Sequence, residues 1–97
     1  IDLYDYDQRH SRAGVAIIIQ PEHQRSGFAL GALQLITKYA AQHLHLHQLY
    51  ASILADNRPS IKLFEKAGFT YSGKKKEWLK INNKFRDELF YQKLLNE

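Results

Sequence analysis

The sequence predicts an α/β fold in which a mixed sheet is combined with two helices. Apolar residues run together at positions 15–19, which is typical of a strand in the middle of a sheet. From Phe28 the apolar residues recur every three or four positions, as on one face of a helix. A strand, a helix and a further strand in succession imply a parallel pair joined by a right-handed crossover. A layered α/β architecture follows.

The first half of the chain supplies two strands and the longer helix. Residues 1–7 predict a strand end with imperfect alternation, and residues 8–12 are polar and typical of a turn. Residues 13–20 predict a second strand, buried on both faces and ended by Pro21. The helix is expected from Phe28 to about Leu44, with its apolar face formed by Ala29, Leu33, Ile36, Ala40 and Leu44.

The second half continues with a strand, a short helix and a hairpin. Residues 46–54 predict a strand, after which Asn57 and Pro59 suit the start of a helix. Gly68 is expected to stop that helix as a C-cap. Residues 69–81 and 84–95 predict antiparallel strands joined at Asn82-Asn83. The predicted order is therefore strand, strand, helix, strand, helix, strand, strand.

Composition indicates a single globular domain over residues 1–97, with 44% hydrophobic and 25% charged residues. The absence of cysteine excludes disulfides and thiolate chemistry. No apolar run approaches the ~20 residues that span a bilayer, so we expect no membrane contact and a cytoplasmic location. The chain begins at Ile1 and contains no Met, so we expect a truncated or trimmed chain.

The formal charge of +4 does not by itself indicate a nucleic-acid partner. The only basic run, Lys74 to Lys76, is followed at once by Glu77 and Trp78. A solvated strand edge explains such a run better than a polyanion site, and we expect no nucleic acid among the partners.

The segment between the second strand and the first helix suits an anion. The first N–H groups of a helix have no intrahelical partners, and its dipole puts partial positive charge there. Phosphate oxygens fit that place. Gly27 has no Cβ that would keep a ligand from the backbone, and Arg25 would add a positive charge. The pattern alone is weak, because an ordinary strand–helix turn explains it as well. The segment reads Gln24-Arg25-Ser26-Gly27-Phe28-Ala29.

Two segments together resemble the GNAT family of N-acetyltransferases. The loop just described matches the family's Gln/Arg-x-x-Gly-x-Gly/Ala signature. Residues 57–69 resemble its second cofactor segment through Asn57, Ser60 and the run Leu63-Phe64-Glu65-Lys66-Ala67-Gly68-Phe69. The closing hairpin looks like that of the branch with ribosomal-protein and spermidine (diamine) acetyltransferases. The resemblance covers nearly the whole chain, and we expect the first strand and helices of the family domain to be missing from it.

The resemblance implies that acetyl-CoA binds where the strands at 13–20 and 46–54 separate. The backbone of Ile17, Ile18 and Ile19 would pair with the pantetheine arm like an added strand. The N–H groups of Arg25 to Ala29 would hold the pyrophosphate. The family pattern thus implies cofactor contacts at Ile17, Ile18, Ile19, Gln24, Arg25, Ser26, Gly27, Phe28, Ala29, Asn57, Ser60, Phe64 and Lys66. No metal is implied.

One departure from the family pattern concerns catalysis. Many relatives carry Tyr where this chain has Phe64, and that Tyr is taken to protonate the CoA sulfur. Phe64 cannot donate a proton, so the reaction would proceed without a dedicated acid, through a water, or with Tyr50 or Tyr71 in its place. Alternatively, Phe64 is simply a packed aromatic side chain. If an acid is missing, Phe64→Tyr should raise turnover.

The acceptor is expected to be a small, polyamine or peptide amine that attacks the thioester directly. Asp2, Asp5 and Asp7 are candidates to contact a cationic acceptor, although a solvated strand edge explains them too. Lys74 to Lys76 could reach the 3′-phosphate of CoA. A CoA-binding module without catalysis is the main alternative function. Because missing strands would expose a sheet edge, we also expect a homodimer, for which an intertwined or strand-exchanged arrangement is one form.

Overall fold

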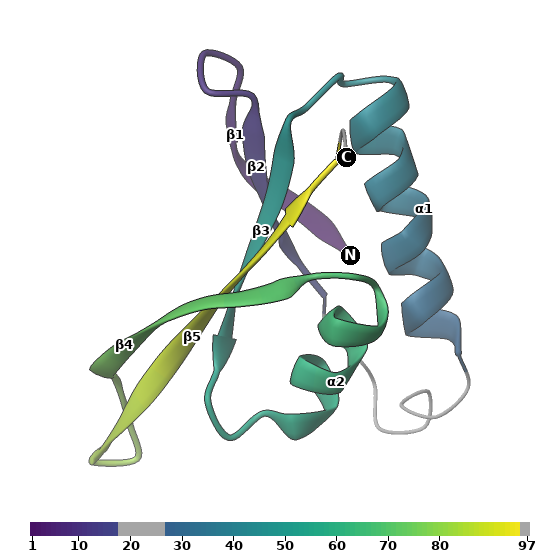
Figure 1. Ribbon diagram of the computed structural model, residues 1–97. Coiled ribbons are helices and arrows are strands. Elements are labelled where there is room, and N and C mark those ends of the chain that lie inside the picture. The colour runs from purple at the N-terminus through teal and green to yellow at the C-terminus, as the bar shows by residue number, and fades with distance from the viewer. Residues whose placement is uncertain (18–26, 96–97) are drawn as a thin grey trace.

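The computed structural model describes residues 1–17 and 27–95. Over these residues it confirms the predicted order of strands and helices (Figure 1). The elements are β1 (Asp2–Asp7), β2 (Arg12–Ala16), α1 (Phe28–Gln42), β3 (Gln48–Leu54), α2 (Arg58–Lys66), β4 (Thr70–Ile81) and β5 (Lys84–Leu94).

The strands form one five-stranded mixed sheet in the order β1-β2-β3-β5-β4. β2 and β3 pair in parallel, as the predicted crossover through α1 requires, and every other pairing is antiparallel. β5 lies between β3 and β4, so the closing hairpin adds its second strand to the middle of the sheet and leaves β4 at the edge.

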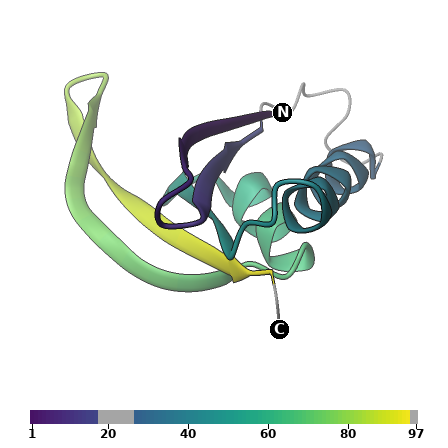
Figure 2. The same cartoon turned by 90° about the horizontal axis from the view of Figure 1, so that it is seen from above.

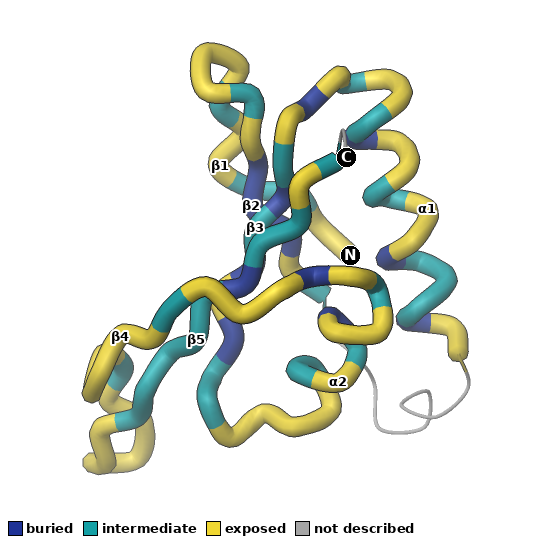
Figure 3. Tube along the Cα trace, in the orientation of Figure 1, coloured by how far each residue is buried: buried dark blue, intermediate teal, exposed yellow. Residues whose placement is uncertain are grey.

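Both helices lie on one side of the sheet, and the hairpin of β4 and β5 arcs away on the other side (Figure 2). The core lies between the helices and the central strands, where the buried residues gather (Figure 3). Leu49, Ala51 and Ile53 alternate into this core as predicted, whereas Tyr50 and Ser52 point to the face that no described helix covers. We call this second side the helix-free face.

The helix caps and the hairpin turn follow the local rules that predicted them. The Asn57 side chain caps α2, accepting a hydrogen bond from the Ser60 N–H at 3.3 Å. The C-cap residue of α2 is Ala67 rather than the predicted Gly68, which follows it with φ of 92°, a value that L side chains rarely adopt. Asn82 and Asn83 both take positive φ in the tight turn between β4 and β5.

The second strand is shorter than predicted. β2 ends at Ala16, whereas the prediction extended to Gln20; Ile17 follows the strand and packs partly buried against the core. Predicted burial on both faces is wrong at Ala16, which is exposed because it points to the helix-free face. Ile18 and Ile19 lie outside the described residues.

Smaller differences occur at other element ends. α1 ends at Gln42 rather than near Leu44, and β3 begins at Gln48 rather than at Leu46, although Leu46 is buried in the core. β1 carries a bulge at Asp5, whose φ is 49°, and this bulge accounts for the imperfect alternation of residues 1–7.

Ion pairs and a hydrogen bond connect the two strands of the closing hairpin. Lys74 and Lys75 approach carboxylates on the neighbouring strand, Asp87 at 3.9 Å and Glu88 at 3.8 Å. The Glu77 N–H donates to the Asp87 carboxylate at 2.8 Å inside a bulge of β4. Two lysines of the basic run, Lys74 and Lys75, therefore already have carboxylate partners, which favours the solvated-edge interpretation.

Candidate functional site

The central feature of the candidate site is a separation of two neighbouring strands. β2 and β3 are joined at Arg12–Gln48, Ala13–Leu49 and Gly14–Tyr50, and their pairing stops there. Beyond that point, within residues 1–17 and 27–95, β2 pairs only with β1, while β3 continues to Leu54 and pairs only with β5. Among the described residues no pair joins the facing edges of the two strands beyond Gly14, and an extended ligand could add its own hydrogen bonds there.

The N-terminus of α1 is built without a side-chain cap. Gly27 is the N-cap residue, with φ of 79°, and its carbonyl accepts a bond from the Gly31 N–H at 3.0 Å. A Cβ built at Gly27 would meet no described atom within 4 Å, so this position leaves room for a ligand atom close to the backbone. Ala29 is buried and Phe28 is exposed; Gln24, Arg25 and Ser26 lie outside the described residues.

The second helix brings the remaining cofactor candidates into one element. Asn57 and Lys66 are exposed at its two ends, and Ser60 is half-buried. Phe64 is only 3% exposed and stacks edge-on against Phe69, with ring centroids 5.0 Å apart. This burial matches the packed-aromatic interpretation of Phe64.

The two tyrosines considered as proton donors lie on opposite faces of the sheet. Tyr71 pairs with Tyr91 on the helix side of β4, and β5 separates it from β3 and the strand separation. Tyr50 lies at the last β2–β3 pair on the helix-free face, where its ring contacts Phe90 at 5.6 Å. The structure thus brings Tyr50, and not Tyr71, to the end of the strand pairing.

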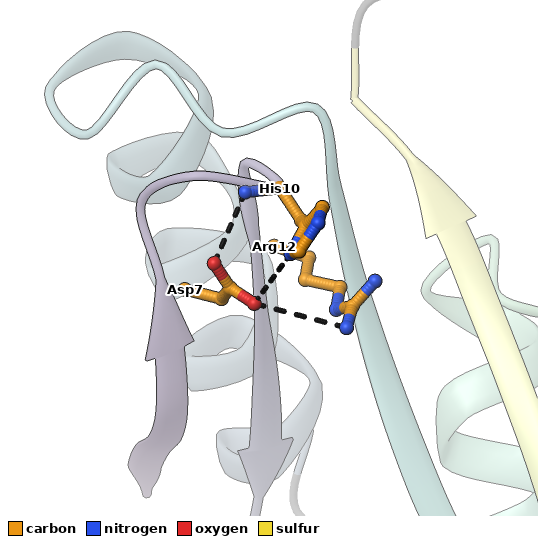
Figure 4. A network of polar contacts seen from close by, with 3 residues as sticks. All are labelled: Asp7, His10 and Arg12. Atoms are coloured by element: carbon orange, nitrogen blue, oxygen red, sulfur yellow. Dashed lines mark hydrogen bonds and ion pairs between the residues drawn. The ribbon is translucent and has the colours of Figure 1, made fainter.

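The three aspartates of the first strand differ in what they contact. Asp7 accepts bonds from the backbone N–H of His10 at 3.0 Å and from its Nδ1 at 2.8 Å (Figure 4). Arg12 lies 3.7 Å from the same carboxylate, and the His10 bonds lower the pKa of Asp7. Asp7 therefore holds its own turn, whereas Asp2 and Asp5 are exposed.

Tyr4 is a residue that our sequence analysis missed. Its ring lies directly over Gly14: a Cβ on Gly14 would come within 2.3 Å of it. Burial raises the pKa of the Tyr4 hydroxyl, the nearby Tyr50 hydroxyl raises it further, and a bond with Ser52 opposes the rise. Gly14 in the middle of a strand was the available signal, since such a glycine often marks the close approach of another group.

One buried and two half-buried tyrosines predict a loss of stability at alkaline pH. Burial raises the pKa of Tyr4, Tyr50 and Tyr91, and the Tyr91 hydroxyl also donates to Glu65 at 3.1 Å. A raised pKa contributes stability that is complete below about 10, the unfolded value, and is lost as pH rises through the folded value. The urea concentration at the midpoint of unfolding should therefore decrease as the pH rises above about 10. Tyr91→Phe should flatten this decline, and an unchanged slope in that variant would contradict the assignment.

The described residues also form a cavity, but no metal site. No group of three His, Cys, Asp or Glu side chains in residues 1–17 and 27–95 is arranged to hold a metal ion. A cavity of about 290 Å³ lies beside the middle of α1, lined by Thr37 and Lys38 and by Lys93 of β5. None of the predicted cofactor contacts lines it.

Comparison with known proteins decides the family. The family model described as "Acetyltransferase (GNAT) domain" matches residues 1–70. The chain belongs to the GNAT acetyltransferase family. It is similar to the spermidine N(1)-acetyltransferase of Vibrio cholerae, with 32% identity over 87 residues, which cover 90% of this chain and 50% of that protein.

Solved structures agree with this assignment. A spermidine N-acetyltransferase from Vibrio cholerae in complex with CoA and spermine superposes with a TM-score of 0.89 at 31% identity. The match covers 96% of this chain and 55% of that one. A dodecameric structure of the Vibrio cholerae enzyme matches with a TM-score of 0.87, over 96% of this chain and 54% of that one. The GNAT fold prediction is confirmed, and the chain spans about half the length of the curated relatives it matches.

The described residues contain no helix long and apolar enough to cross a membrane.

Proposed function

We propose that this GNAT domain transfers the acetyl group of acetyl-CoA to a primary amine, and that the acceptor is a polyamine. The observation that carries the proposal is the separation of β2 from β3 after Gly14, in a chain whose first helix begins at an open Gly27. An extended pantetheine arm fits between two unpaired strand edges, and a pyrophosphate fits the N-terminus of a helix.

In this proposal each cofactor candidate has a physical task. Backbone groups just after Ala16 pair with the pantetheine arm, and N–H groups near Gly27 bind the pyrophosphate. Asn57 uses its amide nitrogen, which its helix cap does not need, because the cap employs only the side-chain oxygen. Ser60 and Lys66 flank the cofactor from α2. The loop residues Gln24, Arg25 and Ser26 keep their predicted role at the phosphates.

The acceptor and the assembly are inferred from relatives. The named relatives act on spermidine, and one solved structure contains spermine, which supports a polyamine over a protein N-terminus. The amine must be neutral when it attacks the thioester carbon, and the leaving thiolate must gain a proton. The dodecameric neighbour supports self-association, and a homodimer is the smallest unit we propose. A cytoplasmic location stays a prediction.

Ligand-induced stabilisation tests the cofactor site. CoA at a hundred times its Kd should stabilise the chain by about 2.7 kcal/mol, seen as a rise in the unfolding midpoint. Gly27→Ala should weaken CoA binding about tenfold, since a Cβ enters the open space and the residue resists positive φ. Gly31→Ala, four residues along the same helix, is the matched control and should bind CoA normally. Equal affinity in both variants would contradict the phosphate assignment.

A CoA-binding module without catalysis is the second candidate. The burial of Phe64 favours it, because this side chain neither carries a proton nor faces solvent. The two functions separate in one assay: both give CoA stabilisation, but only the enzyme releases thiol from acetyl-CoA when amines are added. Stabilisation with no thiol release across a panel of polyamines, amino acids and peptides would favour the module.

A further inference from the structure

We propose that Tyr4 and Glu88, which lie on the helix-free face at the end of the β2–β3 pairing, contact the acceptor and select an amine carrying more than one positive charge. This inference rests on the proposed acetyltransferase function. It assigns acceptor recognition to side chains that the motif comparison did not indicate, and it places them on strands that are far apart in the sequence.

Tyr4 bridges the point where the two strands part. Its ring crosses over Gly14 of β2, the last residue of that strand paired with β3. Its hydroxyl reaches Ser52, which lies two residues further along β3, in the part that β2 no longer contacts. The Tyr4 hydroxyl therefore stands at the edge of the separation, on the side away from the helices.

Aromatic rings continue from Tyr4 across this face. Tyr4 meets Tyr50 edge-on, with ring centroids 6.0 Å apart, and Tyr50 meets Phe90 at 5.6 Å. The three rings come from β1, β3 and β5 and cross the sheet in a row. Such a row suits the carbon chain of an alkylamine, and the ring faces attract an ammonium group.

Glu88 supplies a negative charge beside the row. By strand register it faces the same side as Ser52 and Phe90, and it is among the charges that act on the Tyr4 hydroxyl. Its side chain is only 17% exposed, so water screens it less than a surface carboxylate. Its partner Lys75 lies 3.8 Å away, a loose ion pair on the rim of the face. Asp5 adds a second, exposed carboxylate near Tyr4 and Tyr50.

The direction of approach follows from where the cofactor phosphates bind. Both helices lie on the other side of the sheet, and the proposed phosphate site is the N-terminus of α1 (Figure 2). A cofactor that passes between β2 and β3 from that side points its thioester toward the helix-free face. The attacking amine must come from this face, and the carboxylates there favour a substrate that stays charged at its other nitrogens.

Calorimetric titration of spermidine into the CoA-loaded full chain tests the subsite without depending on turnover. Glu88→Gln should weaken spermidine binding about tenfold, as expected for the loss of a charge-assisted contact. Glu77→Gln, the same change at an exposed position of β4, should leave binding unchanged. n-Butylamine, with a single charge, should lose less than threefold in Glu88→Gln. Tyr4→Ala should weaken both amines, because its ring contacts the carbon chain.

The possible results distinguish a failure of the proposed amine subsite from a failure of the proposed acetyltransferase activity. If the CoA-loaded protein does not bind spermidine, or if the Glu88 and Glu77 variants bind it equally, the subsite is wrong even where acetyl transfer is observed. If CoA stabilises the chain and spermidine binding depends on Glu88, but no acetylated amine forms, the subsite holds and the catalytic proposal fails. Thermal unfolding of each variant shows whether a loss of binding reflects a loss of folding.

Discussion

Replacing Phe64 by alanine is expected to lower the free energy of unfolding by about 3–5 kcal/mol. Phe64 is the buried residue of α2, 3% exposed, and its ring lies against Phe69 within the single core. The substitution leaves a cavity between α2 and the sheet that neighbouring side chains fill only in part. Since domains of this size are stable by about 5–15 kcal/mol, the change removes much of the margin. Urea unfolding at pH 7 measures it.

Phe85 offers a matched control for this prediction. It lies at the far end of the hairpin and is 59% exposed, so Phe85→Ala should change the free energy of unfolding by only about 0.5 kcal/mol. A similar loss at both positions would show that α2 does not dock through Phe64. The Phe64 variant should also bind CoA more weakly, because α2 carries Asn57, Ser60 and Lys66.

Gly14→Ala is expected to destabilise the protein by about 1–3 kcal/mol, the usual cost of forcing atoms into a packed site. The new Cβ would lie 2.3–2.7 Å from three atoms of the Tyr4 ring, so the ring must leave its place over β2. Spermidine binding to the CoA-loaded protein should weaken with it. Gly73→Ala, where no atom lies within 4 Å of a new Cβ, controls for the change of glycine to alanine in a strand.

A double-mutant cycle measures how much of the cost of Gly14→Ala comes from contact between the new Cβ and the Tyr4 ring. If the cost of Gly14→Ala arises from the Tyr4 ring, the same substitution made in a Tyr4→Ala background should be nearly neutral. The coupling free energy should then be close to the whole cost of the single Gly14 change. Additive effects of the two substitutions would mean that Gly14 is needed for some other reason.

Most elements were predictable because local rules act within a few residues. The 3.6-residue period defined the core face of α1, and Asn57 with Gly68 marked the two ends of α2. The paired asparagines identified the hairpin turn. The predictions failed where tertiary context decides: an apolar run suggested that Ala16 was buried, but its side chain points to a face that no described helix covers.

The residues of the candidate site likewise fall into those that a local motif predicts and those that only the tertiary structure brings together. Motifs pointed to Gly27, Asn57 and Phe64 because the residues that bind a phosphate or cap a helix stand together in the sequence. Tyr4, Ser52 and Glu88 could not be found in this way. They meet only because β1, β3 and β5 are brought together by the sheet order, and no local spacing encodes that order.

The short pairing of β2 with β3 also has a consequence for how the native protein opens. Three residue pairs form the only ladder between the β1–β2 ribbon and the remaining three strands of the described sheet. We expect the β1–β2 ribbon to detach from the sheet at a free energy below that of global unfolding. Such partial opening would carry Tyr4 away from Ser52. An amine and a cofactor that contact both the β1–β2 ribbon and the other strands would therefore stabilise the closed state.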